Sequence, residues 1–167
     1  MDPERTLLQH FLAAIAYRTQ KALRDAPEHF PDFAAGHQAR TPVEVLRHMT
    51  SLLGFVCTFY VGGAYPVEPE PLTTFADEIA RFHELLQSVS RQLELGTPLR
   101  VISHQQLLQG PLADVMTHVG QLALLRRLAD APVAPENFIQ AEIRGDRLGA
   151  EQAMPASPDE HWPERPA

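Results

Sequence analysis

Four long stretches of this sequence place apolar residues three and four positions apart, the spacing that makes one face of an α-helix apolar. They cover residues 2–24, 41–62, 73–96 and 111–131. A helix of about 20 residues spans roughly 30 Å, and it buries an apolar stripe of that length most simply against other helices. The sequence therefore predicts an all-α fold, a four-helix bundle.

The first two helices open with specific start signals. Asp2 stands before Pro3, and an acidic cap followed by proline is typical of a helix beginning. Thr41 is followed three residues later by Glu44, which makes a capping box in which each side chain accepts a hydrogen bond from backbone at the other residue. We expect the second helix to begin at this box and to end near Gly62.

The connections before the second and third helices are longer than the two to eight residues usual in simple bundles. Residues 26–40 contain two prolines, and we expect a loop that Phe30 and Phe33 fix to the core. A proline-rich linker, residues 65–72, precedes the third helix. Crossover connections fit these lengths, so the helix connectivity stays open.

The fourth helix is expected to begin only after Gly110 and Pro111, with a short connection over residues 99–108 before it. We assign residues 1–134 to the bundle and residues 135–167 to a C-terminal extension. That extension is expected to hold a short helix at residues 136–139 and then an extended, proline-rich tail. A lone tryptophan, Trp162, predicts that the tail packs against protein and is ordered.

The charge balance bears on partners and location. Acidic residues outnumber Lys and Arg by 21 to 14, and no basic stripe is present, which argues against nucleic acid as a partner. No stretch approaches the 18 apolar residues of a membrane span, and the opening residues lack the positive charge of a secretion signal. We expect a cytoplasmic protein with no membrane partner. Its one cysteine, Cys57, is expected in the core.

Three residues on two predicted helices have the arrangement of metal ligands. His48 lies one helical turn from both Val45 and Leu52, so its imidazole is expected to point toward the interior or the rim of the bundle. Asp114 and His118 are four positions apart, which places them on one helix face with Cβ atoms about 6 Å apart. If the two helices are neighbours, the three side chains can hold one divalent ion.

The remaining histidines are expected to have structural or solvated roles. His83 stands beside Phe82 on the third helix and is interpreted as structural. The others fall on polar faces or in loops: His10, His29, His37, His104 and His161.

Two imidazoles and a carboxylate would leave one or more coordination positions for water or substrate, as in a reactive metal centre. A bound ion would also offset the cost of burying the Asp114 charge. The alternative is a local pair, with Asp114 favoured near a helix start by the helix dipole and hydrogen-bonded to His118. Spacing alone favours this local pair over a metal site.

Two segments carry a resemblance that changes this balance. RTPVEVLRHM and GPLADVMTHVGQLALLRRLADAPV together resemble the DinB-like family of metal-binding four-helix bundles. The family pattern has one histidine on the second helix and H-x-x-x-H-x-G-Q on the fourth. His48 matches the first part and residues 118–121 match H-x-G-Q, whereas Asp114 stands where the commoner pattern has another histidine. The resemblance extends to about Ala131, and the segment after it looks like a feature of one subgroup.

The resemblance implies a divalent metal held by His48, Asp114 and His118, with Zn²⁺ or Ni²⁺ expected ahead of iron or manganese. It also implies a homodimer. Glu44 and Gln121 each lie one turn from a ligand, where they could orient an imidazole or a metal-bound water. For Glu44 the capping box is the stronger interpretation, and for Gln121 both interpretations stay open.

Some members of the DinB-like family are metal-dependent thiol S-transferases. The resemblance therefore implies an open metal position that binds a low-molecular-weight thiol, with an electrophilic small molecule as the second substrate. Metal-assisted hydrolysis is a variant of the same hypothesis. A non-catalytic module that binds a metal or small ligand is a second hypothesis, and a metal-free helical protein is a third. No residue is assigned a catalytic role, and whether the protein is an enzyme stays open.

Overall fold

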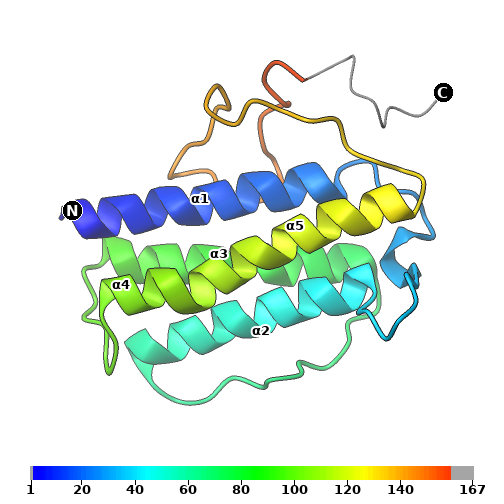
Figure 1. Ribbon diagram of the computed structural model, residues 1–167. Coiled ribbons are helices and arrows are strands. Elements are labelled where there is room, and N and C mark those ends of the chain that lie inside the picture. Colours follow the sequence, from blue (N-terminus) through cyan, green and yellow to red (C-terminus); the bar gives the residue numbers. More distant parts are fainter. Residues whose placement is uncertain (1, 159–167) are drawn as a thin grey trace.

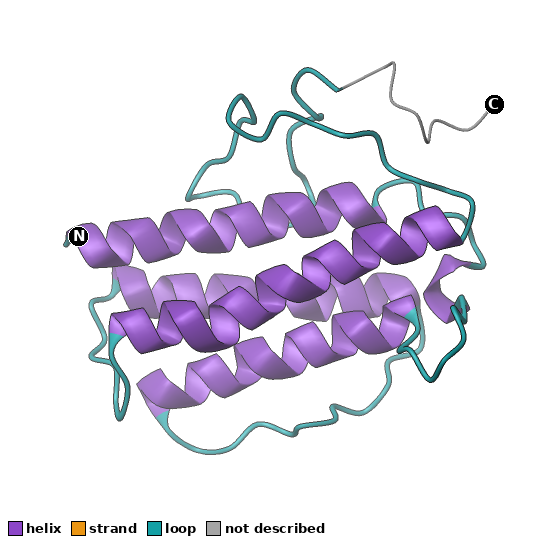
Figure 2. Ribbon diagram, in the orientation of Figure 1, coloured by secondary structure: helices purple, strands orange, loops and turns teal. Residues whose placement is uncertain are grey.

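A computed structural model describes residues 2–158 of the chain. Four long helices lie side by side, α1 (Pro3–Leu23), α2 (Pro42–Val61), α3 (Phe75–Glu94) and α5 (Ala113–Leu128) (Figure 1). The described residues form no strand, and the only β-type pairing among them is a single bridge between Glu136 and Pro158 (Figure 2). The all-α prediction is confirmed. None of these helices is both long and apolar enough to span a membrane.

The four helices form a ring in which α1 and α2 are each in contact with both α3 and α5. Helices α1 and α5 run in one direction and α2 and α3 in the other (Figure 1). The connection between α2 and α3, residues 62–74, therefore passes along the length of the helices as a crossover (Figure 1). This resolves the connectivity that the linker lengths left open.

One core fills the space between the helices, with buried apolar side chains from all four. Members with no exposed surface are Leu12, Ile15, Leu46, Met49, Leu53, Phe82, Leu86, Val115 and Leu122. Cys57 is half-buried and packs against the edge of this core. The loop over residues 26–40 is fixed as expected, because Phe30 is fully buried and Phe33 packs partly against the core around a short 3₁₀ turn, η1 (Phe30–Asp32).

The predicted start signals act as expected. The Asp2 carboxylate accepts a hydrogen bond from the Arg5 amide at 3.1 Å. At the start of α2 the Thr41 amide donates to the Glu44 carboxylate at 2.8 Å, and the capping box is complete. These contacts satisfy backbone donors that a helix start would otherwise leave unpaired.

The fourth helical segment begins earlier than the sequence predicted. It starts as α4 (His104–Leu107), passes through a π-helical turn, η2 (Leu108–Leu112), and continues as α5. The connection expected over residues 99–108 is therefore helical from His104 onward, whereas α5 itself begins after Gly110 and Pro111, as expected. The wider π turn accommodates Pro111, which cannot donate a backbone hydrogen bond, and Gly110 takes up the irregular backbone (φ −93°, ψ −106°).

The C-terminal extension follows α1 without forming a helix among its described residues (Figure 1). The helix expected at residues 136–139 is absent, and a turn takes its place. The Glu136 carboxylate instead accepts hydrogen bonds from the Tyr17 hydroxyl and from the Ala156 amide, so this segment is shaped by contacts with the helix layer. The expectation for Trp162 falls outside the described residues.

Candidate metal centre

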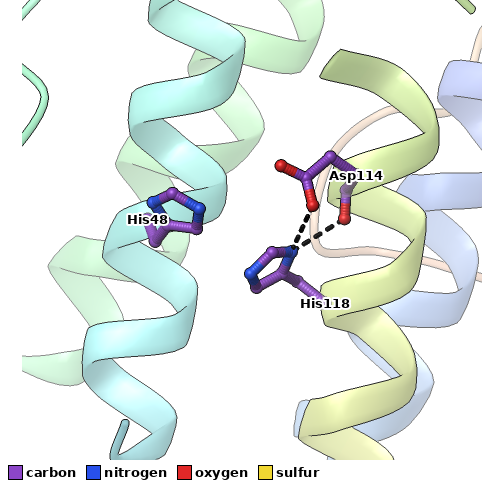
Figure 3. A group of neighbouring side chains, drawn as sticks. All are labelled: His48, Asp114 and His118. Atoms are coloured by element: carbon purple, nitrogen blue, oxygen red, sulfur yellow. Dashed lines mark hydrogen bonds and ion pairs between the residues drawn. The ribbon is translucent and has the colours of Figure 1, made fainter. Parts of the chain in front are cut away.

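The candidate centre lies between α2 and α5, which are neighbours in the ring. His48 is in the second turn of α2 and is half-buried, facing α5 (Figure 3). His118 comes from the second turn of α5, and its side chain is 8% exposed. Asp114, one turn earlier, is 46% exposed. The centre therefore has a buried inner side and an open outer side.

The structure brings the three predicted ligands together. The imidazole rings of His48 and His118 have centroids 4.7 Å apart and are tilted by 57°. One potential ligand atom from each of the three residues lies within 4.8 Å of the others. Ligands of a tetrahedral zinc ion are closer, at roughly 3.4 Å from each other, and the half-exposed Asp114 side chain has room to shorten the separation.

The two nitrogens of His118 have different surroundings (Figure 3). Its Nδ1 lies 2.8 Å from the backbone carbonyl of Asp114 and 3.2 Å from the carboxylate of the same residue. A carbonyl oxygen only accepts hydrogen bonds, so Nδ1 carries the proton and donates it. In the neutral ring, Nε2 then has a free lone pair, as a metal-ligating imidazole requires.

His48 is held in the neutral form that a metal ligand needs. Burial lowers its pKa, and the neighbouring Arg40 and His118 lower it further, while Asp114 acts in the opposite direction. At neutral pH its ring therefore offers a lone pair without first having to lose a proton. The set as a whole carries the single negative charge of Asp114, which suits a divalent cation.

The two residues considered as supports for the ligands have different positions. Glu44 is engaged in the capping box with Thr41, which was the stronger of its two interpretations. Gln121 is exposed on α5, and within the described chain no hydrogen bond joins it to the three candidate ligands. Neither side chain orients the centre in this structure.

His83 has the structural role that the sequence indicated. It is 4% exposed, and its Nδ1 donates to the Leu148 carbonyl of the C-terminal extension at 2.7 Å. His104, expected on a polar surface, pairs with Glu4 at 2.7 Å. Neither contributes to a group of metal-binding side chains among residues 2–158.

Sequence reasoning missed two features beside the centre. A cavity of about 450 Å³ opens next to His48, between the beginning of α2 and residues 67–71 of the crossover. Next to it, Arg47 pairs with the buried carboxylate of Glu78 on α3. A signal for the second feature was present, because Glu78 lies three residues after Phe75 and four before Phe82 on the apolar stripe of α3. The cavity depends on how the crossover folds back, which no local pattern encodes.

Comparisons of this chain with protein-family models, with curated proteins and with solved structures find no match.

Proposed function

We propose that His48, Asp114 and His118 bind a divalent metal ion. The observation that carries this proposal is the pair of imidazoles, contributed by two different helices, facing each other at 4.7 Å beside a carboxylate. A local Asp114–His118 pair explains the contacts within α5, but it gives no reason for His48 to approach from α2. Two neutral imidazoles and a carboxylate are a common ligand set for Zn²⁺ and Ni²⁺, and they also suit iron or manganese.

We further propose that the chain is a four-helix bundle of the DinB-like type. Support comes from the ring of four helices, from the long crossover between α2 and α3, and from the positions of the two histidine-bearing segments on neighbouring helices. Asp114 in place of a histidine is the main departure from the family pattern. A cytoplasmic homodimer belongs to the same proposal, and light scattering on purified protein tests the dimer.

The activity that this centre supports best is thiol S-transfer. A bound divalent ion with an open position would lower the pKa of a small thiol and hold it as a nucleophile at neutral pH. The protein's own part is to fix the ligands. The Asp114 carbonyl holds the proton on His118 Nδ1, and the half-exposed Asp114 carboxylate leaves the outer side open to solvent and substrate.

Elemental analysis of protein purified without an affinity tag tests metal binding. The expected result is close to one divalent ion per chain after incubation with Zn²⁺ or Ni²⁺ and removal of excess metal. Transfer is then measured with a small thiol and an alkyl halide, with and without a chelator. A sulfur–carbon bond forms, halide leaves and the thiol proton passes to solvent, so thioether and halide appear together.

The outcomes separate the hypotheses. Chelator-sensitive transfer supports the enzyme, and metal binding without turnover identifies a non-catalytic module. Failure to bind any of Zn²⁺, Ni²⁺, Fe²⁺ or Mn²⁺ overturns the metal centre and leaves a metal-free helical protein.

A further inference from the structure

The cavity beside His48 has walls of two kinds. One wall is formed by the approach to α2 and its first two turns, and the other by residues 67–71 of the crossover. Its volume of about 450 Å³ is within the range of small-molecule sites. Six of its lining residues are charged or titratable: Arg40, Glu44, Arg47, His48, Glu68 and Glu70.

Two of these side chains, those of Arg47 and Glu44, already have hydrogen-bond partners within the protein. Arg47 donates to the buried Glu78 carboxylate from Nε at 3.0 Å and from a terminal nitrogen at 2.9 Å. Glu44 accepts from the amide and hydroxyl groups of Thr41 at 2.8 and 3.0 Å. Both side chains would therefore bind a ligand more weakly than a side chain without such partners.

Three charged side chains have no such contact within residues 2–158, and they lie on both walls. Arg40 stands two residues before the start of α2, whereas Glu68 and Glu70 come from the crossover. Within the described chain no hydrogen bond or ion pair engages any of these three side chains. The cavity thus offers one available cation on the wall that carries His48 and two available carboxylates on the other.

The crossover wall is held in place by other contacts. Arg81 donates to the Glu70 backbone carbonyl at 2.9 Å, and the Leu72 amide donates to Glu78 at 2.9 Å. Pro69, between the two glutamates, is buried. Binding therefore does not require this wall to be ordered first, which lowers its entropic cost.

We propose that this cavity binds a small zwitterion of the amino-acid type. Arg40 takes the carboxylate, Glu68 and Glu70 take the ammonium group, and the remainder of the molecule extends toward His48. Placing the reacting group of this ligand at the metal position rests on the proposed function. Recognition of its carboxylate and ammonium groups by Arg40, Glu68 and Glu70 does not. A purely anionic ligand fits less well because it would face both crossover carboxylates.

Homocysteine and two truncated analogues test this assignment. The first analogue, 4-mercaptobutyrate, lacks the ammonium group, and the second, 3-mercaptopropylamine, lacks the carboxylate. Each is titrated into cobalt-substituted protein while the sulfur-to-cobalt charge-transfer absorption is recorded. The proteins compared are the parent, Arg40→Gln, and a double variant with Glu68→Gln and Glu70→Gln. Arg100→Gln is the matched control, because Arg100 is exposed and lies at the opposite end of α2.

Homocysteine is expected to bind most tightly to the parent protein. Arg40→Gln should weaken homocysteine and 4-mercaptobutyrate roughly fivefold, as expected for one partly exposed ion pair, and leave 3-mercaptopropylamine unchanged. The glutamate variant should weaken homocysteine and 3-mercaptopropylamine only. The thiols also chelate free cobalt, and this effect cancels when different protein variants are compared using the same thiol. If Arg40→Gln weakens all three thiols equally, or none, the assignment is overturned.

A second measurement separates this proposal from that of the metal centre. The same thiols are titrated into metal-free protein while the amide NMR signals of residues 40–48 and 67–71 are followed. If the parent protein shows shifts that disappear in Arg40→Gln, the zwitterion site is supported even if cobalt does not bind. Absence of such shifts at millimolar homocysteine, in protein that also fails to bind cobalt, overturns both proposals.

Discussion

Arg47 and His48 are adjacent on α2, yet they enter two polar clusters of opposite character. Arg47 turns toward α3, where Glu78 is 1% exposed and also accepts from Arg81 and from the Leu72 amide. His48 turns toward α5, where its nearest polar neighbours are His118 and the half-exposed Asp114. A step of about 100° around one helix separates the two clusters.

The difference between them lies in how completely each is satisfied. The Glu78 carboxylate has hydrogen-bond donors at both oxygens, as burial of a charge requires. In the other cluster His118 uses one nitrogen for the Asp114 carbonyl, and one potential ligand atom from each of the three residues lies within 4.8 Å of the others. The first cluster fixes the crossover to the helices, and the second has the arrangement of a metal-binding site.

The largest predicted effect comes from removing the Glu78 carboxylate. Glu78→Ala should lower the free energy of unfolding by about 3 kcal/mol, because it leaves Arg47, Arg81 and the Leu72 amide without their acceptor. Chemical denaturation measures the change. The matched control is Glu84→Ala on the exposed face of the same helix, which should change stability by less than about 0.5 kcal/mol. Equal effects of the two substitutions would mean that Glu78 has no special structural role.

His48→Ala should weaken metal binding strongly while changing stability little, in contrast to Glu78→Ala. We expect divalent-metal affinity to fall at least about a hundredfold, since even residues that only support a ligand contribute roughly ten- to a hundredfold. Stability without metal should change by no more than about 1 kcal/mol, because the imidazole is half-buried. Competition with a chromophoric chelator measures the affinity. His10→Ala, on the exposed surface of α1, is the control and should bind metal normally. Unchanged metal affinity in His48→Ala would remove α2 from the centre.

The local signals in the sequence predicted much of this structure. Helix starts at Asp2 and Thr41 are encoded by side chains that bond to backbone three residues away, so the sequence is sufficient to find them. The approach of His48 to His118 also followed from helical periodicity, once α2 and α5 are neighbours. Their adjacency itself could be inferred only through the family resemblance.

The two errors have different causes. Gly110 and Pro111 predicted a break, and the backbone of Gly110 is indeed non-helical, but a capping box of Ser103 and Gln106 starts a helical turn before it that was not predicted. The helix predicted at Glu136 lost to the burial of its carboxylate against Tyr17 on α1. The capping box is a local signal, whereas the contact between Glu136 and Tyr17 joins residues that a short window of sequence does not contain.

A smaller effect is expected from Asp114→Asn. The asparagine keeps the size of the side chain and leaves the backbone carbonyl contact with His118 in place, but it removes the negative charge. Metal affinity should fall roughly tenfold, less than for His48→Ala. Since the side chain is 46% exposed, stability without metal should change by less than about 0.5 kcal/mol. Thr117→Ala, an exposed α5 substitution, is the control for affinity. A loss as large as that of His48→Ala would show that Asp114 contributes as much as an imidazole ligand.

The smallest effect concerns His83, a buried histidine that belongs to neither cluster. Burial lowers its pKa, and the hydrogen bond to the Leu148 carbonyl only partly opposes this. The unfolded chain therefore binds a proton at a pH where the folded chain does not, so the stabilising effect is complete above about pH 6.5 and is lost as the pH falls toward the lowered value. The slope attributable to this one group is at most about 1.4 kcal/mol per pH unit.

His83→Asn isolates this contribution, because its amide can donate to the Leu148 carbonyl but does not titrate. The variant should be less stable than the parent at pH 7, and the difference should shrink between pH 6.5 and pH 5 when both are measured by urea denaturation. Other groups, including His48, titrate in both proteins and cancel in the subtraction. Parallel stability curves would mean that His83 becomes protonated without disturbing its contact with the extension.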